Sequence, residues 1–172
     1  MKRSLKVTSF VLLLALCIVV AIVGGTSKPN APVQPIEFSH WQHVKKPEGP
    51  ELDCTFCHEH GDKGPHATIP NTSTCMACHE AMETDKPEVQ KLAEFARKKE
   101  QPPWVRVYWF TAESNVFFSH KPHLKAEVEC ASCHGDVGDM KRVRAEVKQT
   151  MGWCIECHRT RSVSIDCYVC HR

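Results

Sequence analysis

Ten of the eleven cysteines in this 172-residue chain fall into five copies of one pattern, Cys-x-x-Cys-His. In each copy two thiols lie one helical turn apart, which suits the two vinyl groups on one edge of a porphyrin. The histidine that follows is directed beneath the ring, where its imidazole can bind the iron. This spacing is the attachment pattern of covalently bound c-type haem. The five copies are Cys54, Cys57 and His58; Cys75, Cys78 and His79; Cys130, Cys133 and His134; Cys154, Cys157 and His158; and Cys167, Cys170 and His171.

Two other chemistries also use paired cysteines. Structural zinc is held by Cys and His ligands, and a single Cys-x-x-Cys can act as a redox dithiol. Neither requires a histidine directly after every second cysteine, and disulfide pairing leaves those five histidines unexplained. The repetition therefore predicts five covalently attached haem c groups. The ten cysteines are the predicted thioether anchors, and the five motif histidines are the predicted proximal iron ligands.

Six histidines lie outside the motifs and are candidates for the opposite side of each iron. Four of them form two Phe-Ser-His-x-x-His copies, and two histidines three residues apart on a helical turn can serve two neighbouring haems. For the fifth haem we expect His66 rather than His60, because His60 follows the proximal His58 by only two residues. All five haems are then bis-histidine, with predicted distal ligands His40, His43, His66, His120 and His123.

Met151, three residues before Cys154, is an alternative axial ligand. A methionine ligand would raise the reduction potential of that haem relative to a histidine. We expect instead that Met151 packs against a porphyrin face, as we also expect of Trp104, Trp109 and Trp153.

The two Phe-Ser-His-x-x-His copies begin at Phe38 and Phe118, an offset of 80 residues, and divide the chain into two modules. We expect a two-haem module at 36–83 and a three-haem module at 115–172. The connector at 84–114 contains one predicted helix, with Thr84 or Asp85 as its N-cap, Pro87 near its start and Pro102-Pro103 after its end. Residues 104–110 are predicted to form a short β or extended segment that docks aromatic rings on the modules.

The N-terminus predicts export. A basic start, Met1-Lys2-Arg3, precedes an apolar run from Phe10 to Val23, and the basic end of such a segment stays in the cytoplasm. We expect residues 1–25 to be a retained transmembrane anchor, with a cleaved signal or lipidation at Cys17 as alternatives. Residues 26–35 hold three prolines and form an extended linker. The haem-bearing part is therefore expected on the periplasmic side of the cytoplasmic membrane.

Composition limits what else the chain can be. The formal net charge of +2 and the absence of a basic stripe argue against nucleic-acid binding. About 29 residues follow the anchor for each haem, which is too little polypeptide to bury five porphyrins separately. We therefore expect a mostly irregular fold of short α-helices around a core of packed haems, whose close ring edges form a path for electrons.

These motifs together resemble the class III multihaem cytochromes c, which are small, of low potential and bis-histidine ligated. Residues 117–171, with three haem motifs after one double-histidine motif, look like their three-haem members. The resemblance over 36–172 extends to the membrane-anchored pentahaem subunit of alternative complex III and related quinol-oxidising complexes. One departure is that three-haem members usually carry a histidine shortly before the middle motif, where this chain has Thr150 and Met151.

The resemblance implies periplasmic electron transfer beside a quinol-oxidising membrane complex. Its implied partners are integral membrane and iron–sulfur subunits, and small soluble cytochromes are further candidates. Because bis-histidine ligation leaves no open iron position, we expect the chain itself not to be catalytic. The competing hypotheses are a quinol dehydrogenase or multihaem reductase with one five-coordinate haem, a freestanding electron carrier, and a filament-forming cytochrome.

Overall fold

A computed structural model describes residues 31–172, which form one unit. The predicted anchor at 1–25 and Cys17 lie outside the described residues. Within 31–172, no helix is both long and apolar enough to cross a bilayer.

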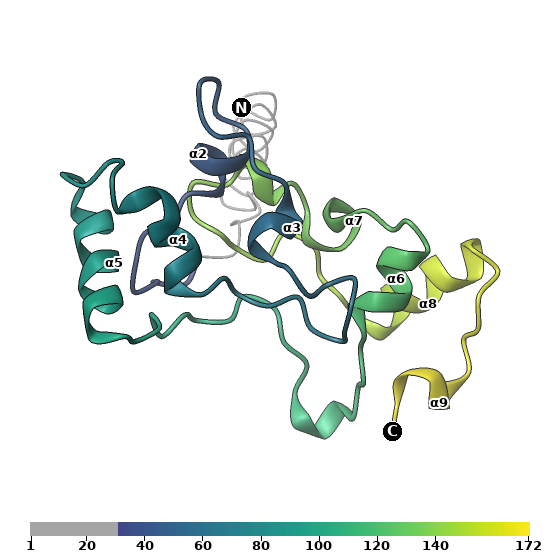
Figure 1. The fold of residues 1–172 in the computed structure, drawn as a ribbon. Coiled ribbons are helices and arrows are strands. Elements are labelled where there is room, and N and C mark those ends of the chain that lie inside the picture. Colours follow the sequence, from purple (N-terminus) through teal and green to yellow (C-terminus); the bar gives the residue numbers. More distant parts are fainter. Residues whose placement is uncertain (1–30) are drawn as a thin grey trace, which may run out of the picture. The chain divides into compact units, whose positions relative to one another are not determined.

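Short helices joined by irregular segments make up the described part of the chain, as predicted (Figure 1). It contains no β-strand; a single isolated bridge joins Val116 to His171. The elements are α2 (His40–Val44), α3 (Cys54–Cys57), α4 (Thr72–His79), α5 (Pro87–Lys98), η1 (Ala112–Ser114), α6 (His120–Lys125), α7 (Cys130–His134), η2 (Val137–Asp139), α8 (Met151–Thr160) and α9 (Cys167–Cys170).

Side-chain caps fix the start of three of these helices. The side chain of Ser39 accepts a hydrogen bond from the backbone N–H of Gln42 and so caps α2. Thr150 caps α8 and Asp166 caps α9 in the same way. Such caps satisfy backbone donors that a short helix leaves unpaired at its first turn. They also fix where each helix begins, and hence which way its first side chains point.

The predicted connector helix is α5, and it begins with Pro87 as expected. Its N-cap is Lys86 rather than Thr84 or Asp85, so that part of the prediction was wrong. The residue before a proline is driven out of the helical region, and Lys86 accordingly has an extended backbone with φ −74° and ψ 133°. The helix ends at the left-handed Lys99.

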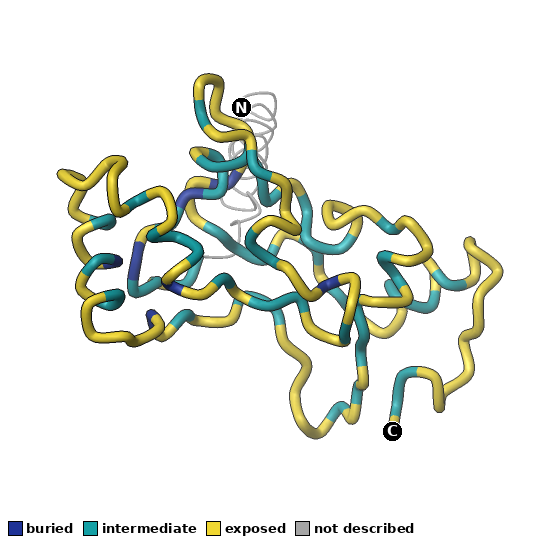
Figure 2. Tube along the Cα trace, viewed as in Figure 1, coloured by how far each residue is buried: buried dark blue, intermediate teal, exposed yellow. Residues whose placement is uncertain are grey.

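The interior of the described unit contains very few apolar side chains. Only Ile36, Leu92 and Met140 are buried hydrophobic residues, and most of the trace is exposed or half-buried (Figure 2). Thirteen large hydrophobic residues are exposed, including Trp109 at 65% and Tyr168 at 83%. A soluble chain rarely exposes so much apolar surface unless something covers it.

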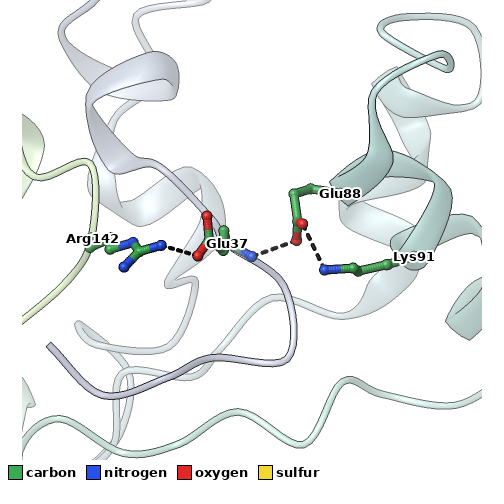
Figure 3. Close-up of polar contacts among 4 residues, drawn as sticks. All are labelled: Glu37, Glu88, Lys91 and Arg142. Atoms are coloured by element: carbon green, nitrogen blue, oxygen red, sulfur yellow. Dashed lines mark hydrogen bonds and ion pairs between the residues drawn. The ribbon is translucent and has the colours of Figure 1, made fainter.

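Polar contacts hold the segment before α2 between two distant parts of the chain (Figure 3). The backbone N–H of Glu37 donates to Glu88 Oε2 at 2.7 Å, and Glu88 also accepts from Lys91 Nζ at 2.7 Å. The Glu37 carboxylate pairs with the Arg142 guanidinium. The first Phe-Ser-His segment is thereby tied to both α5 and the 140–142 segment.

Candidate haem centres

The five Cys-x-x-Cys-His motifs, numbered here sites 1 to 5 in chain order, lie on α3, α4, α7, α8 and α9. In every motif the two cysteines share one helical turn, which puts both thiols on one side of the helix. None of the ten motif cysteines is paired in a disulfide. The backbone thus presents each pair in the arrangement that two thioether bonds to one porphyrin edge need.

Burial disfavours the thiolate form of several of these cysteines. It raises the pKa of Cys57, Cys75 and Cys133 above the ordinary value, and neighbouring thiols raise the pKa of Cys57 and Cys133 further. Reactive redox dithiols are instead found where the pKa of a thiol is lowered. Within the described residues, no group of three or more His, Cys, Asp or Glu side chains is arranged to hold a metal ion by itself.

The two Phe-Ser-His-x-x-His copies adopt the same local structure at α2 and α6. Phe38 lies edge-on to His40, with ring centroids 4.9 Å apart, and stacks on His43 at 4.4 Å. In the second copy Phe118 contacts His120 at 4.9 Å and His123 at 4.7 Å. The phenylalanine therefore orients both histidines of its copy, and the predicted repeat is also a structural repeat.

Each of three histidines from these copies faces a motif histidine. His43 lies 6.0 Å from His79 between ring centroids, His120 lies 6.2 Å from His134, and His123 lies 6.1 Å from His158. Two imidazoles on opposite sides of one metal ion, each bonded at about 2.0 Å and with about 1.1 Å from nitrogen to ring centre, have ring centroids about 6.2 Å apart. The three spacings match that value.

Hydrogen bonds at Nδ1 fix the orientation of most candidate ligands. The acceptor is always a backbone carbonyl, and a neutral imidazole that donates from Nδ1 keeps the lone pair of Nε2 free for a metal. In the pairs His43–His79 and His123–His158, both rings are held in this way. The bonds are His43 to Ser39 at 2.9 Å, His58 to Thr68 at 2.5 Å, His79 to Met82 at 3.2 Å, His120 to Pro65 at 2.9 Å, His123 to Ser119 at 2.7 Å, His158 to Ser164 at 2.7 Å and His171 to Ser114 at 2.9 Å.

His40 differs from its repeat partner His120. Its Nδ1 is buried and has no hydrogen-bond partner. Burial lowers the pKa of His40 to about 4, with smaller contributions from the neighbouring His58 and His43. Burial also lowers the pKa of His43 and His134. These imidazoles are therefore neutral at physiological pH, which is the form that binds a metal.

Comparison with known proteins identifies the family of the chain. Residues 116–172 match the family described as cytochrome c7 and related cytochrome c. The chain is also 31% identical over 166 residues to the multihaem cytochrome c subunit of menaquinone reductase from Nitratidesulfovibrio vulgaris (strain Hildenborough), an alignment that covers 81% of this chain and 77% of the relative. The chain belongs to the multihaem cytochromes c. It is an electron-transport protein that carries covalently bound haem c.

The residues of this cytochrome fit that cofactor on structural grounds. Free thiol pairs stand beside exposed apolar side chains, among them Phe56 in site 1 and Val169 in site 5. Tyr108 adds an edge-on contact to His134 at 4.9 Å, and its hydroxyl accepts hydrogen bonds from the backbone N–H groups of Glu146 and Val147. A flat apolar ring bonded to the thiols would cover surfaces that the protein alone leaves open to water.

The structure gives fewer contacts for the remaining candidate iron ligands, His66, His60 and Met151. His66 is exposed, and the described residues show no ring contact or hydrogen bond of the His66 or His60 side chain. Met151 is 66% exposed at the first turn of α8. His123 faces His158 of site 4, which favours a histidine over Met151 as the second ligand there.

Sequence reasoning missed the groups that orient the ligands. The Nδ1 acceptors are backbone carbonyls, so no residue type marks them in the sequence. The contact of Tyr108 with His134 was foreseen only as a general docking of aromatic rings from 104–110. That segment forms no strand; the amide side chain of Gln34 pairs with both backbone groups of Val105.

Proposed function

We propose that this cytochrome carries five haem c groups, all with two histidine ligands, and transfers electrons on the periplasmic side of the membrane as a subunit of a quinone-linked complex. The proximal ligands would be the five motif histidines. The distal ligands would be His40 for site 1, His43 for site 2, His120 for site 3, His123 for site 4 and His66 for site 5.

The observation that carries this proposal is the set of three histidine pairs at 6.0, 6.2 and 6.1 Å. Each pair joins a motif histidine to a histidine of a Phe-Ser-His-x-x-His copy. His40 is the fourth such residue, and its neighbour is His58. The assignment of His66 to site 5 rests on elimination, because four of the five distal positions are then taken.

The residues proposed to hold the haems suit an electron carrier rather than an enzyme. Bound haem supplies a one-electron couple at its iron. With two histidines held on each iron, a small substrate would find no open coordination position there. The Nδ1 hydrogen bonds to backbone carbonyls increase the basicity of the imidazoles and hold them still. Filled coordination positions disfavour substrate binding, and more basic imidazoles favour a low reduction potential.

The link to a quinone complex is drawn from similarity. The relative in Nitratidesulfovibrio vulgaris is a subunit of a menaquinone reductase, and the sequence resembles the pentahaem subunit of alternative complex III. Both favour partners among integral membrane quinone-reactive and iron–sulfur subunits. The apolar N-terminal run following Met1-Lys2-Arg3 supports an anchor that leaves the haem-bearing part in the periplasm.

Haem stoichiometry tests the core of this proposal. Protein matured in a host competent for cytochrome c assembly should gain the mass of five haem groups in intact mass spectrometry. Its electron paramagnetic resonance spectrum should be entirely low-spin, and the reduced protein should not bind carbon monoxide. Fewer than five haems, or a carbon monoxide complex, would refute five bis-histidine centres. Purification from detergent-solubilised membranes should recover quinone-reactive subunits together with the cytochrome.

The least constrained ligand is His66, and His60 in the same loop is its matched control. In His66→Ala, one haem should become high-spin, because site 5 loses its distal imidazole. In His60→Ala, all five should stay low-spin, because His60 is assigned no iron. The reverse result would assign His60 as the ligand, and no change in either variant would exclude both.

A further inference from the structure

We propose, given the five haem sites of the proposed function, that the sites form a row in the spatial order 2–1–3–4–5, so that site 2 on α4 and site 5 on α9 are its two ends. Chain order would instead place site 1 at an end and site 2 beside site 3. The contacts between the segments that carry the sites support the proposed order, one junction at a time.

Sites 1 and 2 are joined through α2. His43 faces His79 of site 2, and His40, three residues earlier on the same helical turn, neighbours His58 of site 1. The backbone N–H of Leu52, just before site 1, donates to the carbonyl of His43 at 2.8 Å.

Sites 3 and 4 are joined in the same way through α6. His120 faces His134 of site 3, and His123 faces His158 of site 4. The side-chain amide of Gln149, just before α8, donates to the carbonyl of Cys133 at 2.8 Å. The two double-histidine helices therefore each hold one pair of neighbouring sites.

The junction between these two pairs is formed by site 1, not site 2. The loop after His58 lies along α6: the backbone N–H of His120 donates to the carbonyl of Pro65 at 3.1 Å, and that of Lys121 donates to Gly64 at 3.2 Å. A Cβ added at Gly61 would lie 3.1 Å from Leu124 Cδ1.

The thiols of the two sites agree with these backbone contacts, because burial raises the pKa of Cys130 and the neighbouring Cys54 thiol raises it further. Site 1 is thus beside site 3.

Within residues 31–172, the helix of site 2 makes its hydrogen bonds with the end of α5 and not with the segments that carry sites 3, 4 and 5. Thr72 of α4 bonds to the end of α5, and no hydrogen bond of the described residues joins 71–82 to 130–171. In Figure 1, α4 and α9 project to opposite sides of the described unit, with α3 and α7 between them.

Site 5 follows site 4. Cys167 comes only nine residues after His158 of site 4, and the Cys170 thiol adds to the effect of burial in raising the pKa of Cys154. The segment between the two sites folds back because His158 Nδ1 bonds to the carbonyl of Ser164. The other contacts of site 5 are with 114–117, where Phe117 N–H donates to the carbonyl of Cys170 at 2.7 Å.

Iron positions in the matured full-length protein test the order directly. Anomalous diffraction at the iron absorption edge should show five irons whose neighbours are 2–1, 1–3, 3–4 and 4–5. Five irons with site 2 next to site 3 would overturn the order and leave the five-haem proposal standing. Fewer than five irons would overturn both.

A solution experiment uses one substitution at an end and one inside the row. His43→Met at site 2 and His120→Met at site 3 should each raise the potential of one haem, because a methionine ligand does so. Haem-methyl NMR signals followed through a redox titration should then shift for one other haem in H43M and for two in H120M. Two shifted neighbours in H43M would contradict the placement of site 2 at an end.

Discussion

The anchoring of site 2 by Thr72 can be tested by replacing it with valine, which keeps its shape and removes its hydroxyl. Thr72 is 5% exposed and lies three residues before Cys75. Its Oγ1 lies 3.0 Å from the carbonyl of Glu100 and 2.9 Å from Gln101 Oε1. Its backbone N–H also donates to Gln101 Oε1 at 3.0 Å. In Thr72→Val this last bond remains, but the carbonyl of Glu100 loses the hydrogen bond that it accepts from Thr72 at a part-buried site.

The expected cost follows from the loss of that hydrogen bond. A hydrogen bond of this kind contributes about 0.5–1.5 kcal/mol to stability. For a unit of this size, 1 kcal/mol corresponds to roughly 2–4 °C in the midpoint of thermal unfolding. A loss of about 1 kcal/mol would lower the midpoint by roughly 2–4 °C.

Thr160→Val is the matched control, because it makes the same chemical change at an exposed position. Thr160 Oγ1 donates to the carbonyl of Glu156 at 2.9 Å, and water can replace that donor. Its effect should stay within about 0.5 kcal/mol. Both variants, matured with full haem content, would be melted while far-ultraviolet circular dichroism is recorded. Equal midpoints for T72V and T160V would refute the idea that the Thr72 hydroxyl holds α4 to the end of α5.

Three other predictions concern the backbone, pH and the cofactor. Gly135 has φ +73° and ψ −174°, and an added Cβ would lie 2.6 Å from Glu146 Oε2. Gly135→Ala should therefore destabilise the protein by about 1–3 kcal/mol. An unchanged denaturation midpoint would contradict this. Hydrogen bonds from Lys91 and from the amide of Glu37 hold the pKa of Glu88 below its ordinary 4.5. That stabilisation is present above about pH 4.5 and is lost as pH falls through the folded-state pKa, so the stability difference between wild type and Glu88→Gln should shrink from pH 7 to pH 3 in thermal melts. The chain made without haem attachment should give a poorly dispersed amide NMR spectrum, whereas a well-dispersed one would show that the polypeptide folds alone.

Local structure was predictable where short sequence patterns determine it. The two Phe-Ser-His-x-x-His copies, 80 residues apart, form matching helical turns, each preceded by a serine and each with a phenylalanine that contacts both of its histidines. The position of Pro87 at the start of α5 was also predicted correctly. The cap of α5 was assigned wrongly because the preference of Thr and Asp for capping was given more weight than the constraint that Pro87 places on Lys86.

Long-range pairing could not be predicted from the same patterns. The sequence indicated that His123 binds an iron, but not that it lies opposite His158, because that contact depends on how the loops between the helices fold. The Phe-Ser-His repeat also gives no reason for His120 and His40 to differ. They differ because the carbonyl of Pro65 reaches His120 Nδ1 and no equivalent carbonyl reaches His40.

The scarcity of buried side chains explains why sequence periodicity carried so little information about this fold. Hydrophobic patterns predict packing when side chains form the core, and here Ile36, Leu92 and Met140 are the buried hydrophobic residues of the described unit. Many of the other large apolar residues stay exposed, several of them within or beside the Cys-x-x-Cys-His motifs. If haem covers those residues, the spacing of the motifs and the position of each distal histidine determine the fold more than apolar periodicity does. The histidine pairs would then both bind the cofactors and set the arrangement of the helices around them.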